Sequence, residues 1–436
     1  MNPVVYRKLK KLITKPRLYF EDAKLNKQSF NFKKISEELI KAEMFFEKGE
    51  IDKAKALAEN IPRSSQLGAL FLAKIALFEK QYAQSEQDAF QVMQLLSPYS
   101  AEFKKAFYLH QEALRWQHQY DSALTMIENM PFKDNASRYY RALRLACLGA
   151  NAPAKFERQL IRLTSNHKEW LRARNHYIML LRDLGKEQRA LIEANRLVQE
   201  ILRQPKGKPK SPCQRTESQK VQWQAKAATA LLQLKQDLNK HDIEFFLVSG
   251  TLLGCVREGR ILGHDTDIDV GVLPQTSMKQ LRQALSESSR FKFLEVFSEN
   301  TLYVEHANGV HVDIFRHYEQ DGKLYHGGIK CQWWNSPFTL LPQVFLGEQY
   351  LVPEDTNKYL TENYGDWQTP VTDFATFLDT PNMEINNPAN MALYYATQII
   401  TAYRQSEVEK YQRYQCFFKA LMTKLTKNIR LDTSEK

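Results

Sequence analysis

Cysteine is scarce in this chain, and the few cysteines are scattered. Five occur among 436 residues, all of them singly, and no Cys-x-x-Cys pair exists. This pattern argues against a disulfide framework and against a zinc site, so a reduced, cytosolic compartment is expected. The chain also lacks an apolar run of the roughly 18 to 20 residues that span a bilayer. Its N-terminal segment has no continuous apolar region followed by a small-residue cleavage site, so no secretion signal is expected.

Acidic residues are outnumbered by basic ones. The chain has 61 Lys and Arg against 50 Asp and Glu, which gives a formal net charge of +11. This excess favours anionic partners such as nucleotides, phosphorylated polymers, nucleic acid or an anionic membrane, without choosing among them. The length is too great for one ordinary core, so two or more domains are expected.

Glycine is rare in the N-terminal half, and a helical pattern with a faint repeat runs through it. After a basic opening segment, 1–34, the apolar periodicity of residues 35–202 predicts helices throughout. Aligning Ile51, Tyr82 and Tyr120 gives steps of 31 and 38 residues, each with a helix, a short polar turn and a second helix. Steps near 34 resemble tetratricopeptide-like repeats, in which helix pairs stack because one pair cannot bury its own apolar face. An irregular helical bundle is the alternative.

The repeat pattern ends in a basic linker, and a different composition follows it. Residues 203–220 are rich in proline and lysine and mark a domain boundary. Residues 221–385 mix predicted helices and strands and form the expected catalytic domain. Helices return over 386–436. The tail "CFFKALMTKLTKNIR" has an apolar face that suits either packing on the catalytic domain or contact with a membrane, formed by Phe417, Phe418, Leu421, Leu425 and Ile429.

Alternating carboxylates stand out in this basic chain. Asp267 and Asp269 are two residues apart on a predicted strand, so their side chains share one face; Asp265 joins them if the strand begins early enough. Asp313, in "VHVDIF", is flanked by apolar residues and reads as a further inward carboxylate. Neighbouring carboxylates repel one another, and burial makes this worse. A divalent cation removes the conflict, and oxygen ligands of this kind suit Mg²⁺ or Mn²⁺.

A tight turn precedes the acidic run. Ser249 and Gly250 end a predicted strand, and a short helix is expected to begin near Thr251. A helix N-terminus offers free N–H groups to a phosphate, glycine permits close approach, and Arg257 adds a forked donor. Carboxylates, glycine turn and arginine together fit metal-assisted phosphoryl or nucleotidyl transfer.

Several other polar and aromatic residues near these elements have two possible roles. His264 and His311 flank the acidic strands and fit either proton transfer or a structural hydrogen bond. Trp333 and Trp334 fit either stacking on a sugar or base, or simple burial.

The segment "VSGTLLGCVREGRILGHDTDIDVGV" resembles the signature of the LicD/fukutin family, a branch of the polymerase β-like nucleotidyltransferase fold. The later "VDIF" and "YLVPEDTNKYLTENYGDWQTP" follow the same family's order, and the resemblance covers about Val221 to Pro370. The family usually has Pro-Trp before the acidic run and often a third consecutive Asp. Here Gly263-His264 and Thr266 stand at those places, which leaves the identity of the donor open.

The resemblance implies a reaction and roles for the residues. Family members transfer a phosphorylated small alcohol, such as phosphocholine or an alditol phosphate, from a CDP-linked donor to a glycan hydroxyl. Asp267 and Asp269 would hold the metal, and Asp313 would be a further ligand or the general base. The donor would be contacted by Ser249, Gly250, Thr251 and Arg257, with Asp265, His264 and His311 in support.

The N-terminal "YRKLKKLITKPRLYFEDAKLNK" resembles a motif of bacterial capsule-biosynthesis transferases. It reads as a basic helix with Leu18, Tyr19 and Phe20 as an aromatic cluster, suited to an anionic membrane or a partner. We therefore expect a cytoplasmic enzyme, peripheral at the inner membrane, acting on a capsule or lipopolysaccharide acceptor and not on nucleic acid. The alternatives are a nucleotidyltransferase that uses a nucleoside triphosphate, and a repeat scaffold with an inactive transferase domain.

Overall fold

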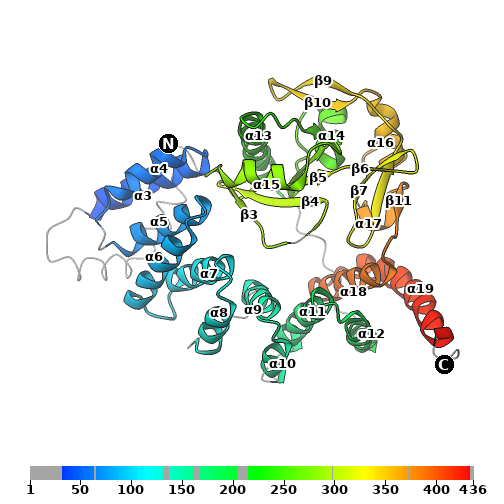
Figure 1. Ribbon diagram of the computed structural model, residues 1–436, viewed down its shortest axis with the longest axis horizontal. Helices are drawn as coiled ribbons and strands as arrows, with labels where there is room; N and C mark the ends of the chain where they lie inside the picture. The colour runs from blue at the N-terminus through cyan, green and yellow to red at the C-terminus, as the bar shows by residue number, and fades with distance from the viewer. Residues whose placement is uncertain are drawn as a thin grey trace.

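The computed structural model describes residues 32–62, 65–130, 137–161, 167–203, 215–296, 298–371 and 373–432. A curved array of helices lies beneath a domain built on a mixed β-sheet (Figure 1). The N-terminal motif with Leu18, Tyr19 and Phe20 falls outside the described residues.

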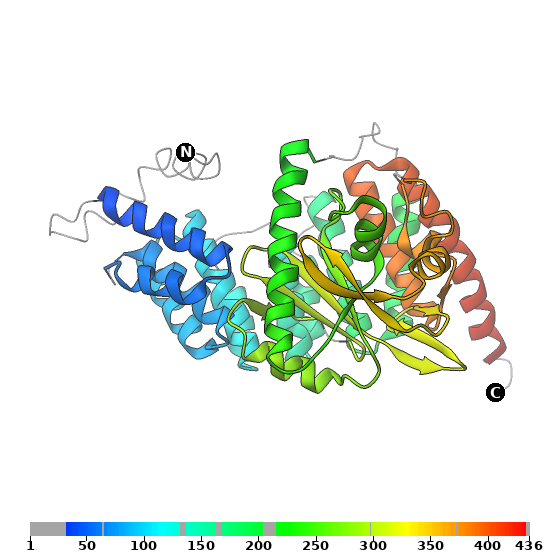
Figure 2. The ribbon, with the colours of Figure 1, turned by 90° about the horizontal axis from the view of Figure 1, so that it is seen from above.

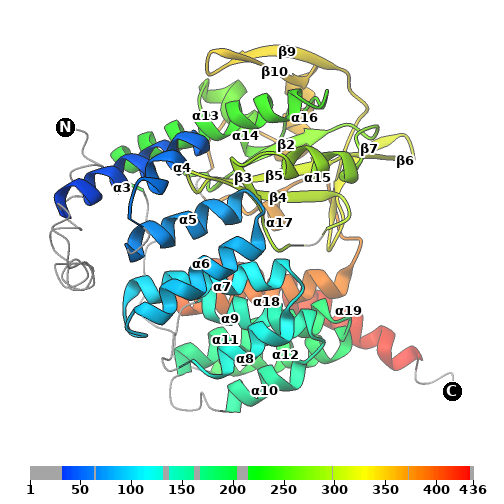
Figure 3. The ribbon, with the colours of Figure 1, turned by 60° about the vertical axis from the view of Figure 1, so that its left-hand side comes forward.

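The N-terminal helices form antiparallel pairs that stack side by side (Figure 3). Each pair joins a first helix to a second through a short turn. The pairs are α3 Phe32–Glu47 with α4 Ile51–Glu59, α5 Gln66–Phe78 with α6 Tyr82–Leu95, α7 Ala101–Trp116 with α8 Tyr120–Glu128, α9 Ser137–Gly149 with α10 Pro153–Ile161, and α11 His167–Asp183 with α12 Glu187–Arg203.

The turns of these pairs share one backbone conformation. In each, the residue two positions before the second helix has a left-handed φ, and the next N–H bonds back to a carbonyl five residues earlier, as from Gln81 to Ala76 (2.9 Å). This is a Schellman-type helix ending, which satisfies carbonyls that the helix leaves free. The left-handed residues are Gly49 (74°), Lys80 (59°), His118 (58°), Asn151 (48°) and Gly185 (70°).

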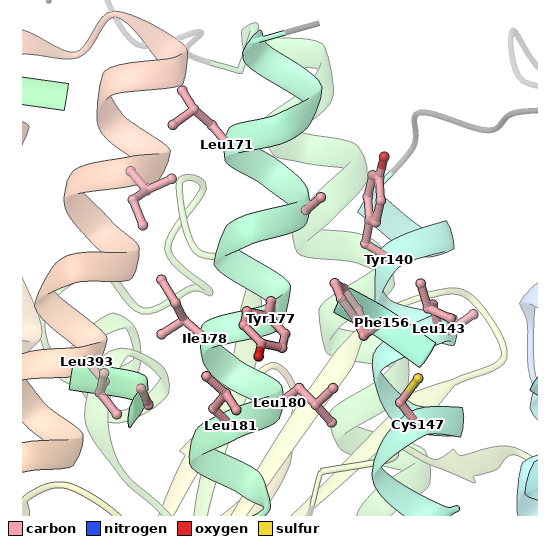
Figure 4. Close-up of a cluster of buried hydrophobic side chains, with 14 of the residues drawn as sticks. Tyr140, Leu143, Cys147, Phe156, Leu171, Tyr177, Ile178, Leu180, Leu181 and Leu393 are labelled. Carbon is pink, nitrogen blue, oxygen red and sulfur yellow. The ribbon is translucent and has the colours of Figure 1, made fainter. Parts of the chain in front are cut away.

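The C-terminal helices return to the helical array. Helix α18 (Pro388–Gln405) packs against α11 and α12, and α19 (Val408–Asp432) packs against α18. Figure 4 shows part of the shared core, with buried side chains from α9, α10, α11 and α18. Phe418 is buried in this core and Leu421 and Leu425 pack against it, whereas Phe417 is 45% exposed. The side chain of Ile429 lies outside the described residues.

The apolar face predicted for the tail therefore packs largely on the array. Within the described part of the chain, none of the helices combines the length and the hydrophobicity that crossing a membrane requires.

The larger sheet has seven strands in the order β3-β4-β5-β2-β1-β10-β9, with β2/β5 and β1/β10 parallel and the other pairs antiparallel. Helices α13 (Glu217–Asn239) and α15 (Met278–Ser286) cover one face, and their apolar residues join the sheet core. The strands are β1 Phe246–Leu247, β2 Asp267–Val272, β3 Phe291–Phe293, β4 Thr301–His306, β5 His311–Arg316, β9 Leu340–Phe345 and β10 Glu348–Pro353.

A smaller antiparallel sheet extends the domain toward the helical array. Its strand order is β11-β8-β7-β6, and the short helix α17 (Thr376–Asp379) precedes β11. Helix α16 (Thr356–Tyr364) follows β10. The strands are β6 Tyr318–Gln320, β7 Lys323–Gly327, β8 Gln332–Asn335 and β11 Met383–Glu384.

Charged contacts join the two parts of the molecule. Arg115 of α7 makes a forked pair with Glu295, with Nε–Oε1 and Nη2–Oε2 distances of 2.7 and 2.8 Å. Lys292 of β3 donates to Glu112 of α7 at 2.9 Å. Seen from above, the sheets lie between the blue N-terminal helices and the red C-terminal helices (Figure 2). These contacts connect α7 of the array to the edge of the larger sheet.

Candidate active site

Strand β2 separates apolar from acidic side chains, as its alternating sequence predicts. Ile268, Val270 and Val272 are fully buried and belong to the core under α13 and α15. Asp267 and Asp269 occupy the alternate positions and point away from that core. The sheet thus uses one face for stability and presents carboxylates on the other.

The pairing of β2 with β5 brings the third carboxylate beside these two. In this parallel pair Asp269 lies directly opposite Asp313, and Asp267 lies opposite His311. Carboxylate oxygens of Asp267, Asp269 and Asp313 all lie within 4.8 Å of one another. Asp313, 44 positions after Asp269 in the sequence, therefore completes one acidic triad with Asp267 and Asp269.

Burial and mutual repulsion make this triad hard to ionise. Burial, followed by repulsion from Asp267, Asp313 and Asp265, raises the pKa of Asp269 well above its ordinary value. Burial and the Asp267 charge also raise the pKa of Asp313 to about 7. A cation bound among these oxygens would reverse both effects, because it favours the ionised carboxylates.

Asp265 lies next to the triad but is not part of it. Strand β2 begins at Asp267, so Asp265 sits in the preceding turn and not on the predicted strand. Its carboxylate is packed against the backbone of Gly250, where a Cβ on residue 250 would lie 2.5 Å from Oδ2. Burial and the neighbouring Asp267 raise the pKa of Asp265 to about 7.

The turn that carries Asp265 is anchored to the linker and to α13. Arg215 donates to the carbonyl oxygens of Gly263 (3.0 Å) and Asp265. Trp223 and Gln224 of α13 donate to the carbonyls of Leu262 (3.2 Å) and Ile261 (2.7 Å). Arg215 was not predicted as a site residue, because it lies in a segment predicted to be an exposed linker.

The glycine turn lies at the pocket, but the helix begins at Ser249, two residues before the predicted start, and β1 ends at Leu247. Helix α14 (Ser249–Leu253) begins at Ser249, whose φ is 48°, and Ser249 and Gly250 line a pocket with the triad. Arg257 also lines the pocket and donates to the Trp367 carbonyl at 3.2 Å. Thr251 is buried instead, and its Oγ1 accepts from the backbone N–H of Asp269 at 2.9 Å. Thr251 thus fixes β2 against α14 and does not face the pocket.

The two histidines differ in position. His264 is exposed on the turn before β2 and lines the pocket. His311 is half-exposed and pairs with Glu305 at 3.6 Å. The Glu305 carboxylate, as acceptor for the ring N–H of His311, raises the pKa of His311. His311 does not line the pocket. It lies on β5 opposite Asp267, at the edge of the acidic cluster.

The pocket has a volume of about 500 Å³ and reaches from the triad to the smaller sheet. Trp333 lines it, whereas Trp334 lies under the ammonium of Lys323, 3.8 Å from Nζ to the ring centroid. Several further lining residues were not predicted as site residues: Tyr303, Lys330, Asn363, Tyr364 and Phe377. They come from four different elements, which no local pattern connects.

The donor set fits a divalent cation. Three carboxylate oxygens in close approach are hard ligands of the kind that a divalent cation prefers. Burial raises the pKa of Asp269 and Asp313 and so favours their protonated forms. A bound cation would take the place of these protons. Fold and site therefore define a class: a mixed-sheet domain with an acidic, metal-compatible centre facing a pocket that also contains an arginine.

Comparison with known proteins finds a family match for part of the chain. Residues 242–341 match the family described as LicD/FKTN/FKRP, nucleotidyltransferase domain. The chain therefore carries a domain of the LicD/fukutin family, as the sequence motifs predicted.

Named relatives agree with this assignment. The chain is 31% identical over 172 residues to the ribitol-5-phosphate transferase FKTN of Macaca fascicularis and 30% identical to that of Homo sapiens; the match covers 37% of this chain and 37% of each relative. It is 30% identical over 105 residues to the uncharacterized protein RT0683 of Rickettsia typhi, covering 23% of this chain and 33% of that protein. The chain thus spans little more than a third of the length of the transferases it matches.

Proposed function

We propose that this protein transfers a phosphorylated small alcohol or sugar, such as phosphocholine or an alditol phosphate, from a CDP-linked donor to a hydroxyl group of a bacterial surface polysaccharide. The observation that carries the proposal is the register of β2 and β5, which places Asp269 opposite Asp313 with Asp267 beside them. The family match and the named activity of the fukutin relatives support the same reaction class.

In this reaction an acceptor hydroxyl oxygen attacks the phosphorus that carries the small alcohol. A new P–O bond forms to the acceptor, the P–O bond to the nucleotide breaks, and CMP leaves with that electron pair. The hydroxyl proton passes to a carboxylate, for which we propose Asp313, because it lies directly opposite Asp269 in the acidic centre and lines the pocket. Arg257 and the Ser249–Gly250 turn would hold the phosphates of the donor.

Asp267 and Asp269, together with Asp313, would hold Mg²⁺ or Mn²⁺. The cation would neutralise the diphosphate of the donor and the charge that develops on transfer. We assign Asp265 and His264 a supporting role at the pocket wall, and His311 a supporting role through its contact with Glu305.

We extend the proposal to the fold and the cellular setting. The repeated left-handed turn supports a tetratricopeptide-like array over residues 35–202, and the family match supports a polymerase β-like nucleotidyltransferase fold for residues 221–385. We propose a capsule or lipopolysaccharide acceptor and a cytoplasmic site of action beside the inner membrane.

Substitution of the triad tests the mechanism. Asp267→Ala and Asp269→Ala should each lower turnover of a CDP-linked donor by at least about 100-fold, because each removes a ligand of the cation. Asp121→Ala, at an exposed position on α8, is the matched control and should retain full turnover. Near-wild-type turnover in either triad variant would contradict the mechanism.

The donor distinguishes the proposal from its alternatives. The chain is incubated with Mg²⁺ and either CTP or a panel of CDP- and UDP-linked compounds, and products are identified by mass. Release of CMP from a CDP-alcohol supports transfer of the phosphorylated alcohol. Release of pyrophosphate from CTP indicates a nucleotidyltransferase, and the absence of Mg²⁺-dependent nucleotide binding indicates an inactive scaffold.

A further inference from the structure

Lys330 is a cation in the active-site pocket that has no carboxylate partner among the described residues. It lies in the turn between β7 and β8 and lines the same pocket as the acidic triad. Its Nζ lies 4.1 Å from the ring centroid of Phe377 and 4.7 Å from that of Tyr394. Phe377 belongs to α17 and Tyr394 to α18, so the helical array supplies one of the two rings.

The turn that carries Lys330 is held in place from the start of α18. Gly327 and Gly328 have φ values of 92° and 137°, which a glycine adopts without strain. Three hydrogen bonds then connect this turn to residues just before or within the first turn of the helix: Asn386 Nδ2 to the Gly328 carbonyl (2.8 Å), Asn390 Nδ2 to the Ile329 carbonyl (3.1 Å) and the Asn387 N–H to the Lys330 carbonyl (3.2 Å).

This environment positions the ammonium but does not neutralise it. The faces of Phe377 and Tyr394 attract a cation through their quadrupoles and carry no net charge. Burial, and to a lesser extent the positive charge of Arg182, lowers the pKa of Lys330. An anion that entered the pocket would offset both effects, so the structure favours a negatively charged group beside Lys330.

The surroundings of Lys330 suit a sugar better than the phosphates of a nucleotide. Trp333 lines this part of the pocket, stacks on His326 at a centroid distance of 5.5 Å and donates from Nε1 to Thr380 at 3.0 Å. Its ring is therefore fixed, as is that of Phe377, and aromatic walls with a few polar groups are typical of sites for small molecules with apolar faces. The carboxylates, by contrast, come from the larger sheet, and Arg257 comes from the π-helix η1 (Gly254–Glu258) that follows α14.

We propose that Lys330 binds an anionic substituent, a phosphate or a carboxylate, of the glycan acceptor, so that the enzyme selects acidic over neutral acceptors. This inference rests on the proposed function, because that function assigns the triad and Arg257 to the donor. It makes Lys330 a specificity residue at the junction of the sheet domain and the helical array. The array would then contribute to acceptor recognition through Tyr394 and the asparagines at the start of α18.

Calorimetric titration of the full chain with three probes tests the assignment. Glucose, glucose 6-phosphate and glucuronate are titrated separately, with and without saturating Mg²⁺ and CDP. Wild type should bind at least one acidic probe about 10-fold more tightly than glucose. Lys330→Met should abolish this preference and leave the affinity for CDP with Mg²⁺ within about twofold. Comparison of the two acidic probes shows whether phosphate or carboxylate is preferred.

Two further variants separate charge from structure. Lys330→Arg keeps the cation and should retain the preference, while melting temperatures report whether each variant is folded. Lys323→Met removes a lysine with the same kind of ring contact on β7 but outside the pocket lining, so it should behave as wild type.

Two results would overturn the inference: equal affinity of wild type for the three probes, or a loss of CDP affinity in Lys330→Met as large as the loss for the acidic sugar. The second result would mean that Lys330 binds a phosphate of the donor and not an anionic group of the acceptor. If wild type fails to bind CDP with Mg²⁺ but keeps a Lys330-dependent preference for acidic sugars, the proposed donor is wrong and the assignment of Lys330 is upheld.

Discussion

Gly250 and Asp265 are in such close contact that a side chain at position 250 would meet the Asp265 carboxylate. A Cβ on residue 250 would lie 2.5 Å from Oδ2 of Asp265 and 3.2 Å from its Cγ. Real Cβ atoms do not approach so closely, so a substitution must displace the carboxylate or the turn. The glycine of the family motif therefore determines where Asp265 lies, in addition to any contact with phosphate.

Gly250→Ala should reduce turnover by about 10-fold or more, because the displaced Asp265 carboxylate disturbs the adjacent triad. The affinity for Mg²⁺ with CDP, measured by calorimetry, should fall with it. Gly259→Ala is the matched control. Gly259 ends the same helical segment with a φ of 62° and has no atoms near its Cβ position, so alanine there costs about 1 kcal/mol of stability and leaves ligand affinity unchanged. Equal effects of the two substitutions on affinity would contradict the prediction.

Asp265 and Asp313 link the stability of the protein to pH. Burial raises the pKa of each to about 7, against about 3.9 for aspartate in an unfolded chain. Between these values the folded protein holds protons that the unfolded chain has lost, so the free energy of unfolding falls as pH rises. The contribution of these two aspartates to the free energy of unfolding, measured by urea denaturation in EDTA, should therefore fall between about pH 4 and pH 7, and saturating Mg²⁺ should remove much of that fall.

Buried histidines act in the opposite sense and must be separated from this effect. Burial lowers the pKa of His306 and His317 to about 4, so their contribution to stability rises with pH between about 4 and 6.5. Asp265→Asn isolates the aspartate, because the amide cannot ionise. The difference in unfolding free energy between the variant and wild type in EDTA should grow in favour of the variant as pH rises. Parallel pH profiles would show that Asp265 ionises normally.

The acidic centre was largely predictable because local rules fix it. Alternation on a strand places Asp267 and Asp269 on one face, and a second strand with the same pattern supplies Asp313. The exact start of β2 was not predictable, since the turn before it is held by Arg215, which is about 50 residues away in sequence. Thr251 was assigned to the donor because the motif contains it, but its hydroxyl is used by the backbone of Asp269. The start of β2 and the role of Thr251 both depend on contacts between segments that are distant in sequence.

The same distinction applies to the helices. Helix positions followed from apolar periodicity, and the alignment of Ile51, Tyr82 and Tyr120 coincides with the first residues of α4, α6 and α8. The repeat was faint in sequence because different residues occupy the left-handed position of each turn. The packing of α18 against α11 and α12 could not be predicted from the sequence. The contact between Lys330 and Tyr394 of α18 depends on that packing.

The left-handed turns give a direct test of backbone strain. His118 is an exposed residue with a φ of 58° between α7 and α8. Because residues with a Cβ pay to adopt this conformation, His118→Gly should raise the free energy of unfolding by about 0.5–1 kcal/mol. His118→Ala keeps the strain and controls for loss of the contact with the Tyr120 hydroxyl, which is 3.0 Å from Nδ1. Urea denaturation measures both; a glycine variant no more stable than the alanine variant would show that the turn is unstrained.

The pair between Arg115 and Glu295 should carry much of the coupling between the helical array and the sheet domain. Arg115 is buried and Glu295 is largely shielded from solvent, so removing one partner leaves a poorly solvated charge without a counter-ion. Arg115→Met and Glu295→Leu should each lower the free energy of unfolding by about 3 kcal/mol, whereas the double substitution should cost much less than their sum. Lys53→Met, which removes one partner of the exposed pair with Glu50, should cost less than about 1 kcal/mol. Chemical denaturation of the four variants measures these differences, and additive losses in the double variant would mean that the two charges do not act as a pair.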